Sequence, residues 1–267
     1  MGQTTRIEWA DATWNPVTGC TPVSDGCRNC YAKRMALRLH GMGLPAYKDG
    51  FGVHLQPHTL NWPATLRRRS RIFVCSMADL FHESVPEEYI DLVFESMLES
   101  SEHVYMLLTK RSGRLRNYAY RRAQVPGQCW PAHVYAGVTV ESASEAYRIA
   151  DLIAVPAKVH FISAEPLLSA LPPLPSQGLD WCIVGGETGP GARIMEPNWV
   201  RDIRDDCRAK RVPFFFKGWG SRYLGGFDYR LIDCERHENM PYEAQAIALQ
   251  RMARKWELAV RKLHKGT

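Results

Sequence analysis

His133–Ala164 reads HVYAGVTVESASEAYRIADLIAVPAKVHFISA, in which two apolar runs flank a helical stretch. The runs are rich in valine, isoleucine and aromatic residues, and they are nearly continuous rather than strictly alternating. Strands that are buried on both faces of a parallel sheet have this composition. The segment therefore predicts a strand, a helix and a second, parallel strand.

Similar units recur on both sides of this segment. The apolar runs start roughly 25 to 35 residues apart, a spacing that suits βα units. Right-handed crossovers between six or seven such strands predict a partial (β/α)6–7 barrel of the TIM type. The further runs are Arg71–Met77, His103–Thr109, Asp180–Gly185 and Val212–Lys217, with a weaker candidate at Ala12–Val17.

The recurrence of these units predicts a barrel over residues 1–220, with an insertion at about 41–70, followed by a loop and an outer helix over 221–267. Ser84–Glu87 predicts a capping box before one helix, and Glu196–Asn198 predicts the start of another. The last helix is expected to dock on the barrel, with its basic face in solvent; a nucleic-acid-facing helix is the alternative. Its apolar face consists of Leu249, Met252, Trp256, Val260 and Leu263.

The composition is that of a globular protein with a mildly basic balance. Its 34 basic and 28 acidic residues give a formal net charge of +6, which permits an anionic partner without requiring one. No apolar run approaches the length of a membrane-spanning helix, and the first residues do not resemble a signal peptide. We therefore expect a cytoplasmic protein without membrane contact. In that compartment its eight cysteines are expected to be ligands or core residues rather than disulfides.

Cys20, Cys27 and Cys30 form a C-x6-C-x2-C pattern directly after the first predicted strand. The glycines, proline and aspartate among them predict a loop that lets three thiolates converge on one centre. Cys75 and Cys182 lie in apolar runs and are expected in the core, and the other cysteines are scattered.

Three thiolates suit two kinds of metal centre. Structural zinc takes four protein ligands, commonly in paired C-x2-C knuckles, and the chain has no second such pair, although His40 is available. A [4Fe–4S] cluster that has three protein ligands leaves one iron open to a cofactor or substrate. The pattern favours the open cluster, with zinc and no metal as alternatives.

Polar or small residues follow each predicted strand, where the active sites of (β/α) barrels gather. A ring of charges there is costly without ligands or mutual pairing. Single members also have structural interpretations: a turn cap for Asp79, solvated helix starts for Lys110 and Arg111, and helix-dipole chemistry for Glu165. In chain order the ring contains Ser76, Asp79, Lys110, Arg111, Thr139, Glu141, Ser163, Glu165, Gly185, Gly186, Glu187, Lys217 and Trp219.

Several stretches resemble a phage-associated three-cysteine-motif family of unknown function that also occurs in bacteria. The family is similar to divergent radical S-adenosylmethionine (SAM) enzymes and distantly similar to spore photoproduct lyase. The six-residue first gap departs from the C-x3-C-x2-C motif of most radical SAM enzymes. The matching stretches are Trp14–Tyr31, Ser76–Phe81, Leu107–Arg111, Gly137–Glu141, Ser163–Leu168, Val184–Arg193 and Phe215–Gly220.

The resemblance implies a [4Fe–4S] cluster on the three cysteines and SAM on its open iron. It implies that Ser76 and Asp79 face the SAM amino group, Lys110 and Arg111 its carboxylate, and Thr139 and Glu141 its ribose. Tyr31 is expected beside adenine or packed against the barrel, and Trp14 and Asn15 beside the pocket. Ser163, Gly185 and Gly186 complete the cofactor site, and Glu165, Glu187 and Lys217 are the catalytic candidates. Gly185–Glu187 follows the sixth strand, whereas the glycine-glycine-glutamate motif of radical enzymes follows the second, so the amino-group role of that motif is not transferred.

These features predict an enzyme that cleaves SAM reductively with an external electron donor. The phage setting suggests a nucleic-acid base or nucleotide as the substrate. One alternative is a non-enzymatic Fe–S or zinc protein that binds nucleic acid. Another is an enzyme that uses the charges at the barrel mouth without radicals.

Overall fold

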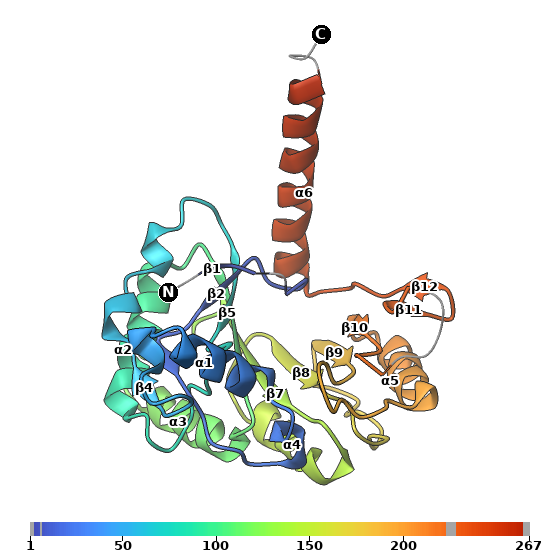
Figure 1. Ribbon diagram of the computed structural model, residues 1–267, viewed down its shortest axis with the longest axis horizontal. Helices are drawn as coiled ribbons and strands as arrows, with labels where there is room; N and C mark the ends of the chain where they lie inside the picture. The colour runs from blue at the N-terminus through green and yellow to red at the C-terminus, as the bar shows by residue number, and fades with distance from the viewer. Residues whose placement is uncertain (1–2, 6, 223–227, 264–267) are drawn as a thin grey trace.

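The structure is a computed structural model that describes residues 3–5, 7–222 and 228–263, with Gln3, Thr4 and the last nine residues as backbone only. Its main sheet has eight strands in the order β1-β2-β5-β6-β7-β8-β9-β10. β1 (Gln3–Thr4) is antiparallel to β2, and the other seven strands are parallel and follow chain order. These seven strands form a curled half-barrel (Figure 1).

The predicted strands are confirmed, each within a few residues. The weak first candidate is also a strand, because Ala12, Thr13 and Trp14 pair in register with Ile72, Phe73 and Val74. The parallel strands are β2 (Ala12–Trp14), β5 (Arg71–Val74), β6 (Val104–Thr109), β7 (Val134–Thr139), β8 (His160–Ala164), β9 (Trp181–Gly185) and β10 (Phe214–Gly218).

A helix lies between each pair of successive parallel strands except β8 and β9, which residues 165–180 join without one. The predicted start of α5 is confirmed, with Pro197 in its first turn. The predicted capping box is wrong. Pro86 is the N-cap of α2, and no side chain caps this helix. The backbone at Pro86 is extended, so the helix begins at Glu87. The helices are α1 (Tyr31–Gly41), α2 (Glu87–Glu99), α3 (Ser112–Gln124), α4 (Tyr147–Ile153), α5 (Pro197–Lys210) and α6 (Tyr242–Leu263).

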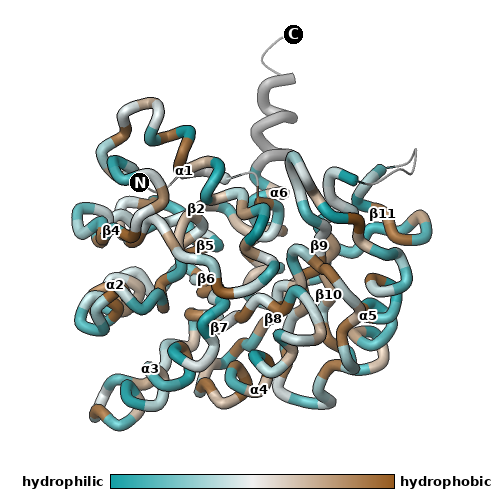
Figure 2. Tube along the Cα trace, turned by 60° about the horizontal axis from the view of Figure 1, so that its bottom comes forward, coloured by the Kyte–Doolittle hydropathy of each residue, from teal (hydrophilic) through white to brown (hydrophobic). Residues whose placement is uncertain are grey.

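Both faces of the sheet are buried, which explains the continuous apolar runs. On the outer face, strand residues such as Ile72 and Ile162 share one core with Ile90 of α2 and Ile203 of α5. Figure 2 shows hydrophobic residues along the central strands. The inner face carries a layer of large side chains, which are Phe73, Met106, Tyr135, Phe161, Trp181 and Phe215.

The insertion runs along one side of the half-barrel. Phe51 of the insertion lies beside the cysteine loop, where Cys20 N donates to Phe51 O at 3.2 Å. The insertion ends at the amino ends of the strands, where Arg69 donates to Glu102 O at 3.0 Å. It contains β4 (His54–Leu55), which pairs with β3 (Val17–Thr18), and short 3-10 helices at Pro45–Tyr47, Pro57–Thr59 and Pro63–Thr65.

The last helix closes the amino end of the half-barrel only with its first turns. Ala244 and Ile247 join the inner core together with Trp9. Leu249 and Met252 are exposed, so the predicted docking of this face does not extend to them; α6 then projects from the body (Figure 1). The side chains of Trp256, Val260 and Leu263 lie outside the described residues. Among the described helices, none combines the length and apolar character that crossing a membrane requires.

Packing of the inner layer depends on one small residue. A Cβ atom at Gly137 of β7 would lie 2.3 Å from the ring of the buried Phe161. We therefore expect Gly137→Ala to lower the free energy of unfolding by about 1–3 kcal/mol through overpacking, measured by urea denaturation. Gly41→Ala is the matched control, because a Cβ there meets no atom within 4 Å. Equal stability of the two variants would contradict this account of the interior.

Candidate metal centre

The cysteine loop, residues 19–30, crosses the carboxyl edge of the half-barrel. It starts where Gly19 N donates to Met77 O at 3.0 Å, next to the end of β5. Gly19 has a φ of +83°, and a Cβ there would lie 1.9 Å from Gly52 O. Only glycine fits this conformation and this contact, so the loop enters the mouth at a fixed point.

The three thiols of the loop are free and partly buried. Arg111 Nη1 lies 3.5 Å from Cys20 Sγ and donates to it, and Ser24 Oγ lies 3.9 Å from Cys27 Sγ. Burial raises the pKa of Cys20 to about 11, and the carboxylate of Asp79 adds to this rise. Metal binding at Cys20 would therefore displace a proton. Among the residues that the structure describes, no three His, Cys, Asp or Glu side chains are close enough to hold a single metal ion.

The first of three tethers binds Thr21 to the ends of β5 and β6. Arg111 Nη2 donates to Thr21 O at 3.2 Å and to Thr21 Oγ1 at 3.0 Å. His82 Nε2 lies 2.8 Å from the same hydroxyl. Arg111 in turn pairs with the buried carboxylate of Asp79 at 3.2 Å and with Glu83 at 2.8 Å. The guanidinium thus joins the cysteine loop to two strand ends.

The second tether lies beneath the middle of the loop. Glu141, which follows β7, is fully buried and accepts a short hydrogen bond from Ser24 Oγ. A Cβ at Gly26 would lie 2.7 Å from Glu141 Oε1, so the loop backbone packs directly on this carboxylate. Arg148 of α4, also buried, donates to Glu141 Oε2 at 2.8 Å, and Lys110 Nζ lies 3.7 Å from that oxygen.

The third tether joins the loop to the segment after β9. Asn29 Nδ2 donates to Glu187 Oε2 and to Gly191 O, both at 2.9 Å. Arg193 donates to Glu187 Oε1 at 2.6 Å and to Asp25 Oδ2 at 2.5 Å. Burial alone would raise the pKa of Glu187, but the hydrogen bonds from Arg193 and Asn29 outweigh it and hold the pKa at about 2.

The structure therefore brings five predicted site residues into contact with the loop or with its tethers: Asp79, Lys110, Arg111, Glu141 and Glu187. Their partners include residues that the sequence did not single out. Arg193 and Asn29 lie within the stretches that resemble the family. Arg148 lies outside those stretches, and its sequence does not indicate a role in the site, because an arginine on a helix is usually solvated. The six-residue gap between Cys20 and Cys27 supplies Thr21, Ser24 and Asp25, which make these contacts.

Other predicted residues lie near α1 or under the mouth. Tyr31 begins α1, and its hydroxyl donates a short hydrogen bond to Ser76 O. Asn15 Oδ1 accepts from Ser76 Oγ at 3.2 Å and from Met77 N at 2.9 Å, so Asn15 positions the segment after β5. Thr139 and Ser163 are buried, and Trp14 is a fully buried core residue.

Glu165 and Lys217 form a short ion pair that remains partly exposed, with about a quarter of each side chain accessible. A Cβ at Gly185 would lie 3.3 Å from both side chains, so glycine leaves room for the pair. Gly186 packs on the backbone of Trp219, because a Cβ there would lie 2.2 Å from Trp219 O. Glu165 and Lys217 are therefore the predicted catalytic candidates that remain partly accessible at the mouth.

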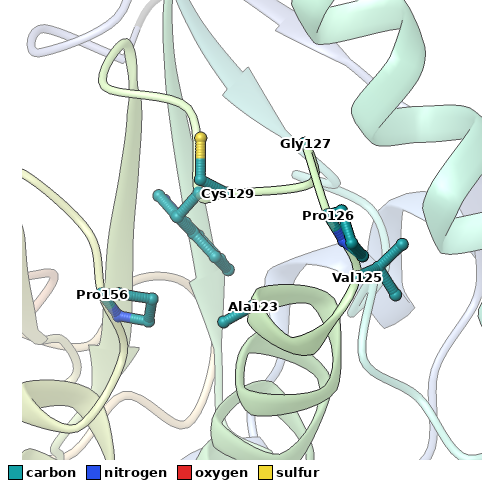
Figure 3. A pocket seen from close by; sticks show the side chains of 7 residues that line it. Ala123, Val125, Pro126, Gly127, Cys129 and Pro156 are labelled. Atoms are coloured by element: carbon teal, nitrogen blue, oxygen red, sulfur yellow. The ribbon is translucent and has the colours of Figure 1, made fainter.

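A cavity of about 410 Å³ lies elsewhere, between the end of α3 and the start of β7 (Figure 3). Its lining is mainly apolar and contains none of the predicted site residues. The lining residues are Ala123, Val125, Pro126, Gly127, Cys129, Trp130 and Pro156. The polar groups that suit a cofactor converge at the barrel mouth instead.

The fold and the site define a class: a parallel half-barrel with a three-cysteine loop tethered across its carboxyl edge. Residues 4–257 match the family described as protein of unknown function (DUF5131), and the chain belongs to this family. No curated protein matches the sequence.

Among solved structures, two of spore photoproduct lyase are similar to this chain. One is a double mutant with bound AdoMet and dinucleoside spore photoproduct, with a TM-score of 0.47, 11% identity and coverage of 94% of this chain. Another is the lyase complexed with dinucleoside spore photoproduct, with a TM-score of 0.43, 9% identity and coverage of 81% of this chain. The chain spans 63% and 58% of the lengths of those chains, respectively.

Stability should depend on the buried tether at Glu141. Glu141→Gln leaves the buried Arg148 guanidinium without its counter-charge, and we expect a loss of about 3 kcal/mol in the free energy of unfolding. Lys158→Gln removes an exposed pair with Glu243 as a control, and should cost less than about 1 kcal/mol. Urea denaturation at pH 7 measures both, and similar losses would show that the Glu141 pair does not brace the loop.

Acid should loosen the third tether. Because the pKa of Glu187 is about 2 in the folded protein and 4.5 ordinarily, its contribution is complete above about pH 4.5. That contribution, roughly 3 kcal/mol, is lost as the pH falls toward 2. Comparing unfolding free energies between pH 5 and pH 2 should give a shallower decline for Glu187→Gln than for the wild type. Parallel curves would refute the assignment.

Proposed function

We propose that this protein holds a [4Fe–4S] cluster through Cys20, Cys27 and Cys30 and cleaves SAM reductively to begin radical chemistry. The observation that carries the proposal is the position of three partly buried thiols on one loop at the carboxyl edge of a half-barrel. With three protein ligands, one iron of such a cluster stays open for the SAM amino and carboxylate groups. When bound, the reduced cluster would supply the electron that breaks the SAM sulfonium bond.

The chain's own residues would fix the geometry of this centre. The tethers to Arg111, Glu141 and Glu187 hold the loop at separate strand ends, so a cluster on it would have a defined orientation. Arg111 Nη1 donates to Cys20 Sγ, a contact that would stabilise negative charge on this ligand. Groups that orient ligands in this way are a regular part of metal sites.

The contacts also favour one cation for the SAM carboxylate. Arg111 is buried and has bonds to Asp79, Glu83 and Thr21, so it has little freedom to turn. Lys110 is partly exposed, and its Nζ lies 3.7 Å from Glu141. We therefore assign the carboxylate to Lys110 and a positioning role to Arg111.

We propose Glu165 and Lys217 as the groups that would act on a substrate. Their ion pair lies above Gly185 at the mouth, where a proton donor and a proton acceptor stand together. A substrate group inserted between them would exchange protons with either side chain. The proposed substrate remains a nucleic-acid base or nucleotide, and an external protein would donate the electron.

Cys27→Ala tests the proposal, with Cys129→Ala as a matched control on an exposed cysteine outside the loop. Wild-type protein purified without oxygen should be brown, with about four irons and absorption at about 400 nm. Dithionite and SAM should then yield 5′-deoxyadenosine. Cys27→Ala should lose the colour and at least about 90% of product formation, because two thiolates hold a cluster poorly, and Cys129→Ala should keep both.

The outcomes separate the alternatives. A colourless protein with one zinc would overturn the proposal. A loaded cluster without SAM cleavage would favour the metal-containing nucleic-acid-binding protein. Cleavage of SAM by Cys27→Ala would show that the reaction site lies outside the cysteine loop.

A further inference from the structure

A basic segment follows the cysteine loop. Residues 26–48 contain five lysines or arginines and no aspartate or glutamate, with Asp25 and Asp49 at its borders. None of these five cations forms an ion pair with any residue that the structure describes, whereas Arg71, Arg111 and Arg148 each pair with a carboxylate. Cations that have no ion-pair partner produce a positive potential that attracts anions.

Part of this charge lies on one side of α1. We call this side the α1 face, and its residues are Tyr31, Arg34, Met35 and Arg38. The positions i, i+3, i+4 and i+7 are neighbours on a helix, and the four side chains line a cavity of about 260 Å³. Tyr31 and Met35 are 50% and 43% exposed, so apolar surface alternates with the two arginines.

The α1 face borders the proposed reaction site. The helix begins one residue after Cys30, and the Tyr31 hydroxyl is bound to Ser76 O. Arg34 Nη2 donates to Thr188 O at 2.8 Å, and its guanidinium packs on Gly189. The face therefore lies between the segments that follow β5 and β9, and a ligand on it would reach the mouth.

We propose that the α1 face binds single-stranded nucleic acid and presents one nucleotide to the mouth. The inference names the substrate class of the site proposed above and rests on that function. Arginines pair with phosphates, while an exposed tyrosine and a methionine offer surfaces for unstacked bases. An acidic protein segment would satisfy the arginines but would not require the aromatic ring, and paired bases in a duplex would not expose their faces to it.

Anisotropy of a labelled mixed-sequence 12-nucleotide DNA strand tests the proposal, using cluster-loaded protein without reductant or SAM. In Arg34→Gln/Arg38→Gln we expect at least tenfold weaker binding. The slope of log K against log salt should fall by about 1.4, since each lost phosphate contact on a single strand contributes about 0.7. Arg67→Gln/Arg68→Gln removes the same charge from two exposed residues before β5 and should leave the slope unchanged. Equal effects of the two pairs would overturn the proposal.

Tyr31 tests the stacking part. Tyr31→Ala should weaken binding at least about fivefold, whereas Tyr31→Phe, which keeps the ring, should bind like the wild type. The single strand should bind more tightly than a duplex of equal length. Equal affinity for the duplex, or binding to phosphatidylserine vesicles with the same loss in the arginine variant, would overturn the assignment to single strands.

The two proposals fail in different ways. SAM cleavage by a protein that does not bind the DNA strand would overturn this inference alone. Strand binding by a loaded protein that does not cleave SAM would overturn the proposed function alone. Arg34→Gln/Arg38→Gln should retain its colour and its cleavage of SAM, and loss of both would mean that these arginines support the metal centre instead.

Discussion

The buried pairing of Glu141 with Arg148, 2.8 Å apart beneath Gly26, is the interaction on which the site depends. A carboxylate without solvent contact is stable only with full compensation, which the guanidinium and the Ser24 hydroxyl provide. The Glu141 carboxylate fixes the position of the loop between Cys20 and Cys27 relative to the edge of the sheet. It also links α4, a helix with no cysteine of its own, to the position of Cys20, Cys27 and Cys30.

The same logic extends along the carboxyl edge of the sheet. Asp79, Glu141 and Glu187 follow three different strands, and each pairs with an arginine. Arg111 and Arg193 also contact the cysteine loop directly, whereas Arg148 acts on it through Glu141. A loop of this length would otherwise have many conformations. Three separated ion-pair contacts restrict it far more than one would, so the half-barrel acts as a template for the loop.

The fold was largely predictable because burial on both faces leaves a continuous apolar run in the sequence, as in His160–Ala164. The gathering of three cysteines on one loop was predictable from spacing, and the positions of the strand-end residues from topology. Their partners were not, because pairing depends on which side chains meet across the sheet. Arg148 reaches Glu141 from seven residues away on α4, and nothing in its local sequence distinguishes it from a solvated arginine. The sequence pattern also did not predict that part of the apolar stripe of α6 is exposed, because such a stripe does not reveal whether another element covers it.

The aromatic layer inside the half-barrel has a consequence for selection. Phe161 occupies the space that Gly137 leaves free, and the inner layer continues to Trp9, Ala244 and Ile247 at the amino end, so side chains fill the interior of the half-barrel. Under the proposed function, a substrate that meets Glu165 and Lys217 would find no open barrel interior, and most of its bulk would stay outside. Overall size would then discriminate poorly between substrates, and the shape of the edge that reaches the ion pair would decide which ones react.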